Sequence, residues 1–151
     1  MTDKGHIVTF SGKCLDVSGA SEENGANIIQ WECHGGDNQK FDLEPVEGKP
    51  TKYYRIKARH NGKCLDVSGA SQENGAEIIQ WECHGGDNQK FKLVPIDRDN
   101  GLYLIKAKHS GKCLDVAAAS QENGAKIIQW ECHGGDNQKF KISMGSFTDR
   151  C

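Results

Sequence analysis

The chain has 151 residues, of which 36% are hydrophobic and 7% aromatic, and its formal net charge is −2 at pH 7. This length suits one ordinary domain, and the apolar content is too high for a disordered chain. The weak negative charge argues against nucleic acid or an anionic membrane as the main partner, and no apolar run is long enough to be a membrane span.

A block of thirty residues occurs three times, at 12–41, 62–91 and 111–140. Its first copy reads GKCLDVSGASEENGANIIQWECHGGDNQKF; the first and second copies differ at two positions, and the second and third at three. A repeat of this length indicates a repeat architecture. We therefore expect a single domain over 1–151, made of three repeats at about 1–47, 48–97 and 98–151.

Each repeat predicts four short strands. The first is an alternating run at 6–10, 53–59 and 102–108; in the second repeat Tyr54, Ile56 and Ala58 alternate with basic residues, a period of two typical of a half-buried strand. The second strand is the sequence CLDV, and a polar loop rich in turn-forming residues follows it.

The third strands are predicted at 28–33, 78–83 and 127–132. The sequence HGGDN then predicts a tight turn in which both glycines supply backbone freedom. The fourth strands begin at 39–43, 89–93 and 138–142, and Pro45 and Pro95 are expected to end the first two of them.

These elements predict an all-β fold with about twelve short strands, since no stretch has a helical period. A four-stranded unit cannot bury its own apolar face, so the three repeats must pack together. The closed arrangement that fits is a barrel with threefold internal pseudosymmetry, a β-trefoil. A three-bladed propeller is the alternative, but it has fewer blades than known propellers.

Six of the seven cysteines form one pair per repeat: Cys14 and Cys33, Cys64 and Cys83, Cys113 and Cys132. Six cysteines allow fifteen pairings, and the repeat favours the one in which each unit closes on itself. Such disulfides favour secretion or action outside the cell. The alternative is reduced thiols in a protein stored in the cytosol, because the first residues lack a signal-peptide core. Cys151 is left over; it could link two chains, and the sequence leaves the oligomeric state open.

The repeated CLDV, QW-x-CH and final Gln-x-aromatic triplet resemble the ricin B-type (R-type) lectin family, both its galactose-binding lectins and its xylan-binding modules. The likeness covers essentially the whole chain. In the family the triplet usually ends in Trp, whereas here it ends in Phe41, Phe91 and Phe140, a difference that affects packing more than binding. The family fold implies a six-stranded barrel capped by three hairpins.

The resemblance also implies the sugar-binding residues. They comprise a hydroxyl-accepting carboxylate, a stacking indole, a histidine, an amide and a glutamine that supports the carboxylate: Asp16, Trp31, His34, Asn38 and Gln39; Asp66, Trp81, His84, Asn88 and Gln89; Asp115, Trp130, His133, Asn137 and Gln138. Several family lectins have Gln two residues before the indole. Here the residue is Ile29, Ile79 or Ile128, so one sugar contact is missing.

Each of these residues alone has an ordinary structural explanation: Asp could cap a turn, Trp could belong to the core, and His could be a solvated turn residue. Their joint occurrence at fixed spacing in three units favours a site. The strands around the block diverge more than its polar loops, and packing alone does not require identical polar residues. Recent patchwork duplication or deliberate symmetrisation would also produce this pattern.

Other chemistries fit less well. An adjacent Cys-His pair lacks the spacing of a structural zinc site, and three identical cysteine pairs do not provide a unique nucleophile. Triplicated identical carboxylates do not resemble the catalytic pair of a glycosidase. We therefore expect a lectin that is not an enzyme and has no metal or cofactor, with galactose or N-acetylgalactosamine on glycans as its partner. The alternatives are a xylan-type polysaccharide-binding module and a protein-interaction or inhibitor module on the same fold.

Overall fold

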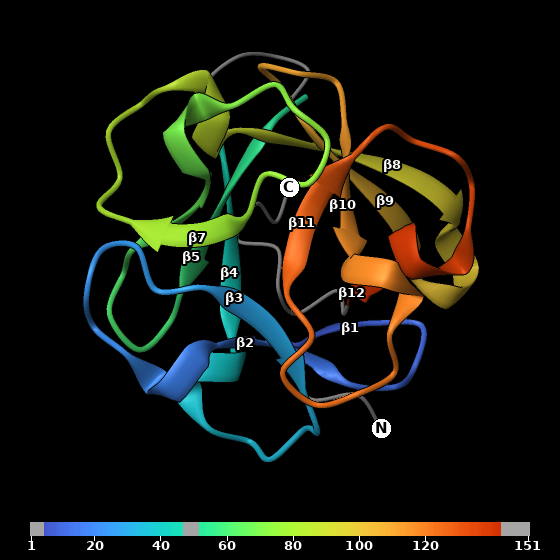
Figure 1. The fold of residues 1–151 in the computed structure, drawn as a ribbon, viewed down its shortest axis with the longest axis horizontal. Helices are drawn as coiled ribbons and strands as arrows, with labels where there is room; N and C mark the ends of the chain where they lie inside the picture. Colours follow the sequence, from blue (N-terminus) through green and yellow to red (C-terminus); the bar gives the residue numbers. More distant parts are fainter. Residues whose placement is uncertain (1–4, 47–51, 143–151) are drawn as a thin grey trace.

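The computed structural model describes residues 5–46 and 52–142, and it is an all-β structure (Figure 1). Its strands are β1 (Ile7–Val8), β2 (Cys14–Val17), β3 (Ile28–Trp31), β4 (Phe41–Pro45), β5 (Tyr54–Ala58), β6 (Cys64–Val67), β7 (Ile78–Trp81), β8 (Phe91–Asp97), β9 (Leu102–Ala107), β10 (Cys113–Val116), β11 (Ile127–Trp130) and β12 (Phe140–Ile142). Short 3-10 helices link them: η1 (Ser18–Ala20), η2 (Asp37–Gln39), η3 (Ser68–Ala70), η4 (Asp87–Gln89), η5 (Arg98–Asn100), η6 (Ala117–Ala119) and η7 (Asp136–Gln138).

The strands form the predicted β-trefoil. The barrel consists of β1, β4, β5, β8, β9 and β12, and the strand pairs β1–β12, β12–β9, β9–β8, β8–β5 and β5–β4 are all antiparallel. The Phe41 amide closes the barrel by donating a 2.8 Å hydrogen bond to the Gly5 carbonyl. The hairpins β2–β3, β6–β7 and β10–β11 cap one end, and β3, β7 and β11 meet around the threefold axis (Figure 1).

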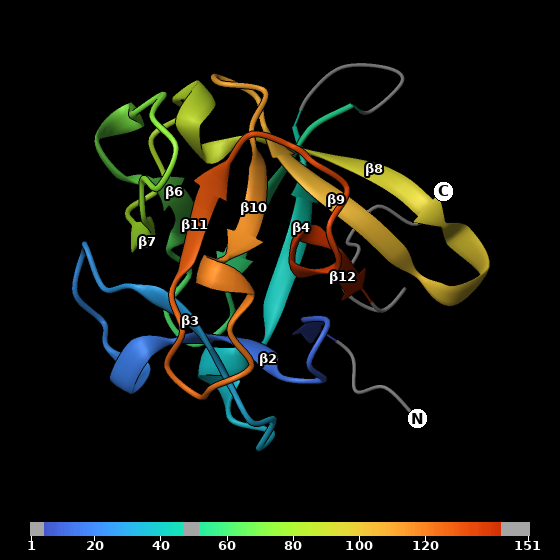
Figure 2. The same cartoon turned by 45° about the vertical axis from the view of Figure 1, so that its right-hand side comes forward.

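The predicted second strands match β2, β6 and β10, but other boundaries differ. β3, β7 and β11 each end at the tryptophan, two residues earlier than predicted. The prediction that Pro95 ends its strand is wrong, because β8 continues to Asp97 as one side of the β8–β9 hairpin that extends from the barrel (Figure 2). The register shifts between Pro95 and Asp97, and a bulge of this kind tolerates a residue without an N–H.

The core lies inside the barrel, where the three closing phenylalanines Phe41, Phe91 and Phe140 are fully buried. Leu15 and Val17 reach this core from β2, and Ile28 reaches it from β3. Burial of this kind contributes about 1.5–3 kcal/mol for each large apolar side chain. Phe in place of the family's usual Trp is thus a packing difference within the core.

Buried glutamines join the three units, a role that the sequence did not reveal. Gln30 is fully buried, and its amide donates to the carbonyls of Ser120 and Glu122 in the third unit, both at 2.9 Å. Gln80 makes the same contacts to the first unit, and Gln129 makes them to the second. Each glutamine thereby fixes the polar loop of the neighbouring unit, which lies beside its own hairpin.

Each cysteine pair forms a disulfide within its own repeat, between Cys14 and Cys33, Cys64 and Cys83, and Cys113 and Cys132. Each bond joins the start of the first hairpin strand to the segment after the second. Cys151 lies outside the described residues. Within the described part of the chain, no helix is both long and apolar enough to cross a membrane.

Candidate functional site

Each unit has a shallow cavity on the outer side of its hairpin, with volumes of about 370, 500 and 320 Å³ in the first, second and third units. The first is lined by Asp16, Ser18, Gly19, Ala20, Ile29, Trp31, His34 and Asn38. The second is lined by Asp66, Ser68, Gly69, Ala70, Ile79, Trp81, His84 and Asn88. The third is lined by Asp115, Ala118, Ala119, Ile128, Trp130, His133 and Asn137.

The strand register explains why a carboxylate and an indole share one cavity. In the first unit Asp16 lies opposite Ile29, and Cys14 lies opposite Trp31. Residues opposite one another in an antiparallel pair point to the same face, and successive residues alternate between faces. Asp16, Ile29 and Trp31 therefore face outward, while Leu15 and Val17 face the core.

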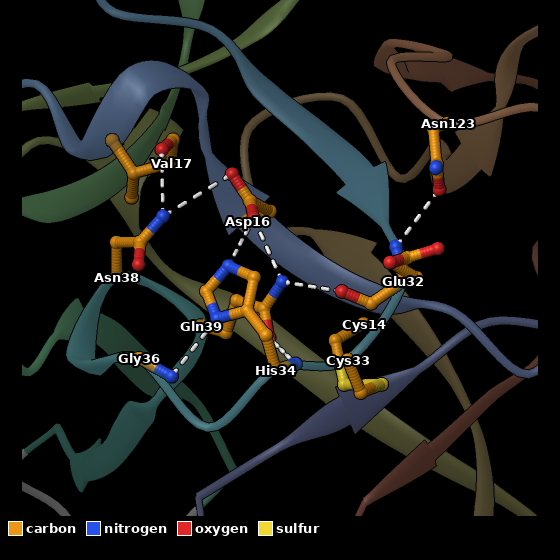
Figure 3. Close-up of polar contacts among 10 residues, drawn as sticks. All are labelled: Cys14, Asp16, Val17, Glu32, Cys33, His34, Gly36, Asn38, Gln39 and Asn123. Atoms are coloured by element: carbon orange, nitrogen blue, oxygen red, sulfur yellow. Dashed lines mark hydrogen bonds and ion pairs between the residues drawn. A yellow bond between two sulfur atoms is a disulfide. The ribbon is translucent and has the colours of Figure 1, made fainter.

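Asp16 is only 4% exposed, and its carboxylate is held by two side-chain amides (Figure 3). Gln39 Nε2 donates to Oδ2 at 2.8 Å, and Asn38 Nδ2 donates to Oδ1 at 3.3 Å. The same contacts recur at Asp66, with 2.8 and 3.2 Å, and at Asp115, with 2.9 and 3.1 Å. The carboxylate orientation is thus fixed before any ligand arrives.

Gln39 is placed differently from the other predicted site residues. It is fully buried and lies behind the carboxylate rather than in the cavity wall. Its Nε2 also donates to the Glu32 carbonyl at 3.0 Å, and its Oε1 accepts from the His34 amide at 2.9 Å. Gln89 and Gln138 repeat these bonds. The glutamine therefore joins the end of the hairpin to the carboxylate and positions it.

The hydrogen bonds of His34 indicate its tautomer. The Gly36 amide donates to Nδ1 at 3.0 Å, so in the neutral ring the proton is on Nε2 (Figure 3). That Nε2 lies 3.7 Å from Asp16 Oδ2, and the distances are 3.5 Å at His84 and 3.6 Å at His133. These distances exceed a normal hydrogen bond, so the N–H can be offered to a ligand hydroxyl near the carboxylate.

The two glycines of the HGGDN turn have different roles, which corrects the expectation that both supply backbone freedom. Gly35 has φ +81°, a conformation that favours glycine. Gly36 has an ordinary extended backbone, with φ −71°. A Cβ at Gly36 would lie 2.7 Å from His34 Cε1 and 2.9 Å from Asn38 Oδ1. This glycine is required because it leaves room for the site histidine.

Burial raises the pKa of the Asp16 carboxyl above its ordinary value of 3.8, although hydrogen bonds from Gln39 and the charge of nearby His34 oppose the shift. The pKa values of Asp66 and Asp115 are raised for the same first reason. A buried carboxylate with a raised pKa can accept hydrogen bonds strongly, because it has lost its water.

The three indoles are exposed despite lying in strands, with 39% of Trp31, 38% of Trp81 and 38% of Trp130 accessible. The loop of a neighbouring unit supports each of them. For Trp31, Asn123 Oδ1 accepts from the next amide, that of Glu32, at 2.8 Å. A Cβ on Gly124 would lie 3.9 Å from the ring. Asn24 and Asn74 make the corresponding bonds to Glu82 and Glu131.

The structure therefore brings the predicted Asp, Trp, His and Asn of each unit together around one cavity. The sequence-based prediction missed the η1 residues Ser18, Gly19 and Ala20, which also line the first cavity. Their signal was the polar loop directly after CLDV, repeated in the second unit. Ile29 is 8% exposed and fills the position where several family lectins have Gln.

This arrangement combines one exposed ring with fixed hydrogen-bonding groups in a shallow cavity. A ring can cover an apolar C–H face, and a carboxylate can accept from two adjacent hydroxyls. Within residues 5–46 and 52–142, no group of three His, Cys, Asp or Glu side chains is placed to hold a metal ion. The ring and the fixed polar groups would suit a ligand that has an apolar face and adjacent hydroxyls.

The ricin-type beta-trefoil lectin domain matches residues 3–140, so the chain belongs to this family. Domains of the family are carbohydrate-binding modules and are generally not catalytic, although some similar structures are enzymes that contain such a domain. No curated protein sequence matches the chain significantly.

Three solved structures illustrate the similarity. The chain is 46% identical to ThreeFoil, a designed threefold-symmetric protein, with a TM-score of 0.85 over 92% of this chain and 97% of that one. It is 38% identical to part of an exo-β-1,3-galactanase from Clostridium thermocellum, with a TM-score of 0.86 over 94% of this chain. The chain spans only 30% of that enzyme. The Rhizoctonia solani agglutinin shares the fold at 23% identity, with a TM-score of 0.78 over 93% of this chain and 95% of that one.

Proposed function

We propose that the chain is a lectin with three sugar-binding sites that prefers galactose or N-acetylgalactosamine and has no enzymatic activity. The observation that carries this proposal is the threefold recurrence of an exposed tryptophan beside a buried, amide-held carboxylate in one cavity. An exposed indole in a strand has little structural value, so its repetition favours a role in binding.

The proposed binding mode uses four groups. In the first unit Trp31 stacks on the apolar face of the pyranoside, and Asp16 accepts from two adjacent hydroxyls. His34 Nε2–H donates to one hydroxyl, and the Asn38 side chain contacts another. A galactoside has an axial 4-hydroxyl, which leaves the opposite face of its ring apolar and suited to an indole. The 38% identity to part of a galactanase is consistent with this preference.

One ring and a few hydrogen bonds in a shallow cavity should bind a monosaccharide with roughly millimolar affinity, about −4 kcal/mol. Three such sites on one rigid body gain about 10²–10⁴ in avidity on a surface dense in glycans. We infer that cross-linking or agglutination of glycan-bearing cells is the resulting activity. The three disulfides support action in an oxidising, extracellular setting.

The test replaces all three site carboxylates, Asp16, Asp66 and Asp115, by alanine. Retention on galactose-agarose, elution by free galactose and cell agglutination should all be lost. The matched control replaces Asp37, Asp87 and Asp136, which are exposed aspartates in the adjacent turns and lie outside the three cavities.

A second variant replaces the three exposed tryptophans, Trp31, Trp81 and Trp130, by alanine. It removes no buried group, and it should also lose sugar binding. Retention of agglutination by both triple variants would refute the proposed sites. A glycan array of the unaltered protein separates galactosides from xylan, and strong binding to xylan alone would overturn the galactose preference.

A further inference from the structure

The third cavity differs from the other two along one wall. The first and second units have Ser-Gly directly after CLDV, at 18–19 and 68–69, whereas the third has Ala117 and Ala118. Among the few positions at which the near-identical blocks differ, two lie at this wall and one lies at the threefold axis. A difference beside the ligand space is the one expected to change binding.

A serine lines the cavity in two units, and its hydroxyl is absent from the third. Ser18 and Ser68 line their cavities, but Ala117 does not line the third. The hydrogen bonds that hold Asp16 and Asp66 come from Asn and Gln side chains, so neither hydroxyl is needed for that task. The third cavity holds its carboxylate in the same way and lacks only the hydroxyl.

The alanine at 118 also narrows the cavity. Gly19 and Gly69 have φ +64° and +63°, and a Cβ added at either would meet no atom within 4 Å. Ala118 keeps this left-handed conformation with φ +57°, and its side chain lines the third cavity. Its methyl group thus occupies space that is open in the other units.

We infer that the three sites are unequal: Ala117 and Ala118 make the third a weaker sugar site, and Ser18/Gly19 and Ser68/Gly69 are affinity-determining pairs in the first two. This inference rests on the proposed lectin function. Loss of one neutral hydrogen bond corresponds to roughly a 2- to 10-fold loss of affinity. On a sparse glycan surface the protein then acts as a divalent lectin, and the third site fills only at higher ligand density.

The test uses three single-site proteins, each made by replacing the tryptophans of the other two units by alanine. Binding of methyl β-galactoside is measured for each by NMR through its one remaining indole signal. The first and second sites should bind with similar affinity, and the third should bind roughly 2- to 10-fold more weakly. Ala117→Ser with Ala118→Gly should restore the third site, and Ser68→Ala with Gly69→Ala should weaken the second by the same factor.

Thermal unfolding checks that every variant is folded. Ala118→Gly relaxes a left-handed alanine, so the restoring variant remains informative even if Gly69→Ala misfolds. Equal affinities at the three sites, or reciprocal exchanges that leave them unchanged, would overturn the inference while the lectin function stands. Saturable binding at none of the single-site proteins would refute the proposed function and this inference with it.

Discussion

Asp16, Asp66 and Asp115 are nearly inaccessible and each lines a cavity, so their ionisation sets the charge that the cavity presents to a ligand. Burial raises their pKa values, so each takes up a proton at a higher pH than an exposed aspartate does. A protonated carboxyl loses the charge-assisted acceptance of two hydroxyls. Sugar binding is therefore expected to be the property most sensitive to mild acid.

We predict that affinity for methyl β-galactoside falls as pH is lowered, with a midpoint above 3.8, the ordinary pKa of an aspartate. The same shift has the opposite effect on folding. A carboxyl whose pKa is raised in the folded state stabilises the fold most below the unfolded pKa, and this contribution is lost as pH rises through the folded pKa. Lowering the pH should thus weaken binding while protonation of these three groups favours the folded state, as parallel titrations of affinity and of near-UV circular dichroism would reveal. A midpoint at or below 3.8 would contradict the assigned role.

Gly36, Gly86 and Gly135 give a second test at this scale. Alanine at these positions has an allowed backbone conformation, but its Cβ must displace the site histidine or the asparagine carbonyl. We predict about a tenfold loss of sugar affinity from the lost contacts, which corresponds to 1.4 kcal/mol. The thermal unfolding midpoint should change little. Isothermal titration and differential scanning calorimetry measure the two effects, and an unchanged affinity would show that His34 does not contact the ligand.

Much of the site could be predicted from sequence because its residues recur three times at fixed spacing. What could not be predicted depends on three-dimensional placement. The resemblance implied that Gln39 supports Asp16, but the sequence does not reveal that Gln39 is fully buried, or that Gly36 leaves room for a ring. It also hides the support of Trp31 by Asn123, because the two lie in different repeats.

At the scale of elements, the hairpin is the unit that holds a cavity, and its disulfide joins the start of the first strand to the segment after the second. The alternation at 53–59 and the threefold block were readable in the sequence, so a closed barrel of about twelve strands was predicted correctly, and the three hairpins followed from the family resemblance. The length of β8 was not predicted correctly, because a bulge allows Pro95 inside a strand. A one-residue bulge depends on the facing strand, which local sequence does not specify.

We predict that Cys14→Ala with Cys33→Ala lowers the free energy of unfolding by about 3 kcal/mol, the value for a closed loop of this length. The two bonded cysteines are 19 residues apart in the sequence. Among the three indole N–H signals in an NMR spectrum, that of Trp31 should lose its response to sugar before those of Trp81 and Trp130. The reason is that the removed bond joins the segments on which Asp16 and Trp31 lie. Urea unfolding of the double variant measures the loss, and full stability without the bond would contradict the account.

The threefold axis explains another difference between the repeats. Asn27, Glu77 and Lys126 are equivalent positions that meet around this axis, and Lys126 Nζ lies 2.7 Å from Glu77 Oε2. Three identical charges at this place would repel one another. The pair is half-exposed, so we predict that Lys126→Glu lowers the free energy of unfolding by less than about 1 kcal/mol in 0.1 M salt. Adding Glu77→Lys should restore the stability measured by urea unfolding, and no recovery would contradict the pairing.

At the scale of the whole molecule, the trefoil arranges its three hairpins around one axis (Figure 1), and each hairpin carries one of the three cavities. The interlocking glutamines and asparagines between units hold the sites in a fixed arrangement. Avidity then depends on how many sites are intact. We predict that disabling one tryptophan lowers agglutination titre modestly, and that disabling two abolishes it, because a single site cannot cross-link. A titre that survives in a single-site protein would show that agglutination comes from another surface.

The central claim is that each of the three cavities binds a sugar, and the chain offers a direct report of it. Its three tryptophans all lie in these cavities, so each indole N–H signal in a ¹⁵N NMR spectrum reports on one site. Titration with methyl β-galactoside should move all three signals saturably, and replacing Asp16, Asp66 and Asp115 by alanine in the folded protein should abolish every shift. If the three signals stay fixed up to ligand concentrations well above the millimolar range, the cavities are not galactoside sites.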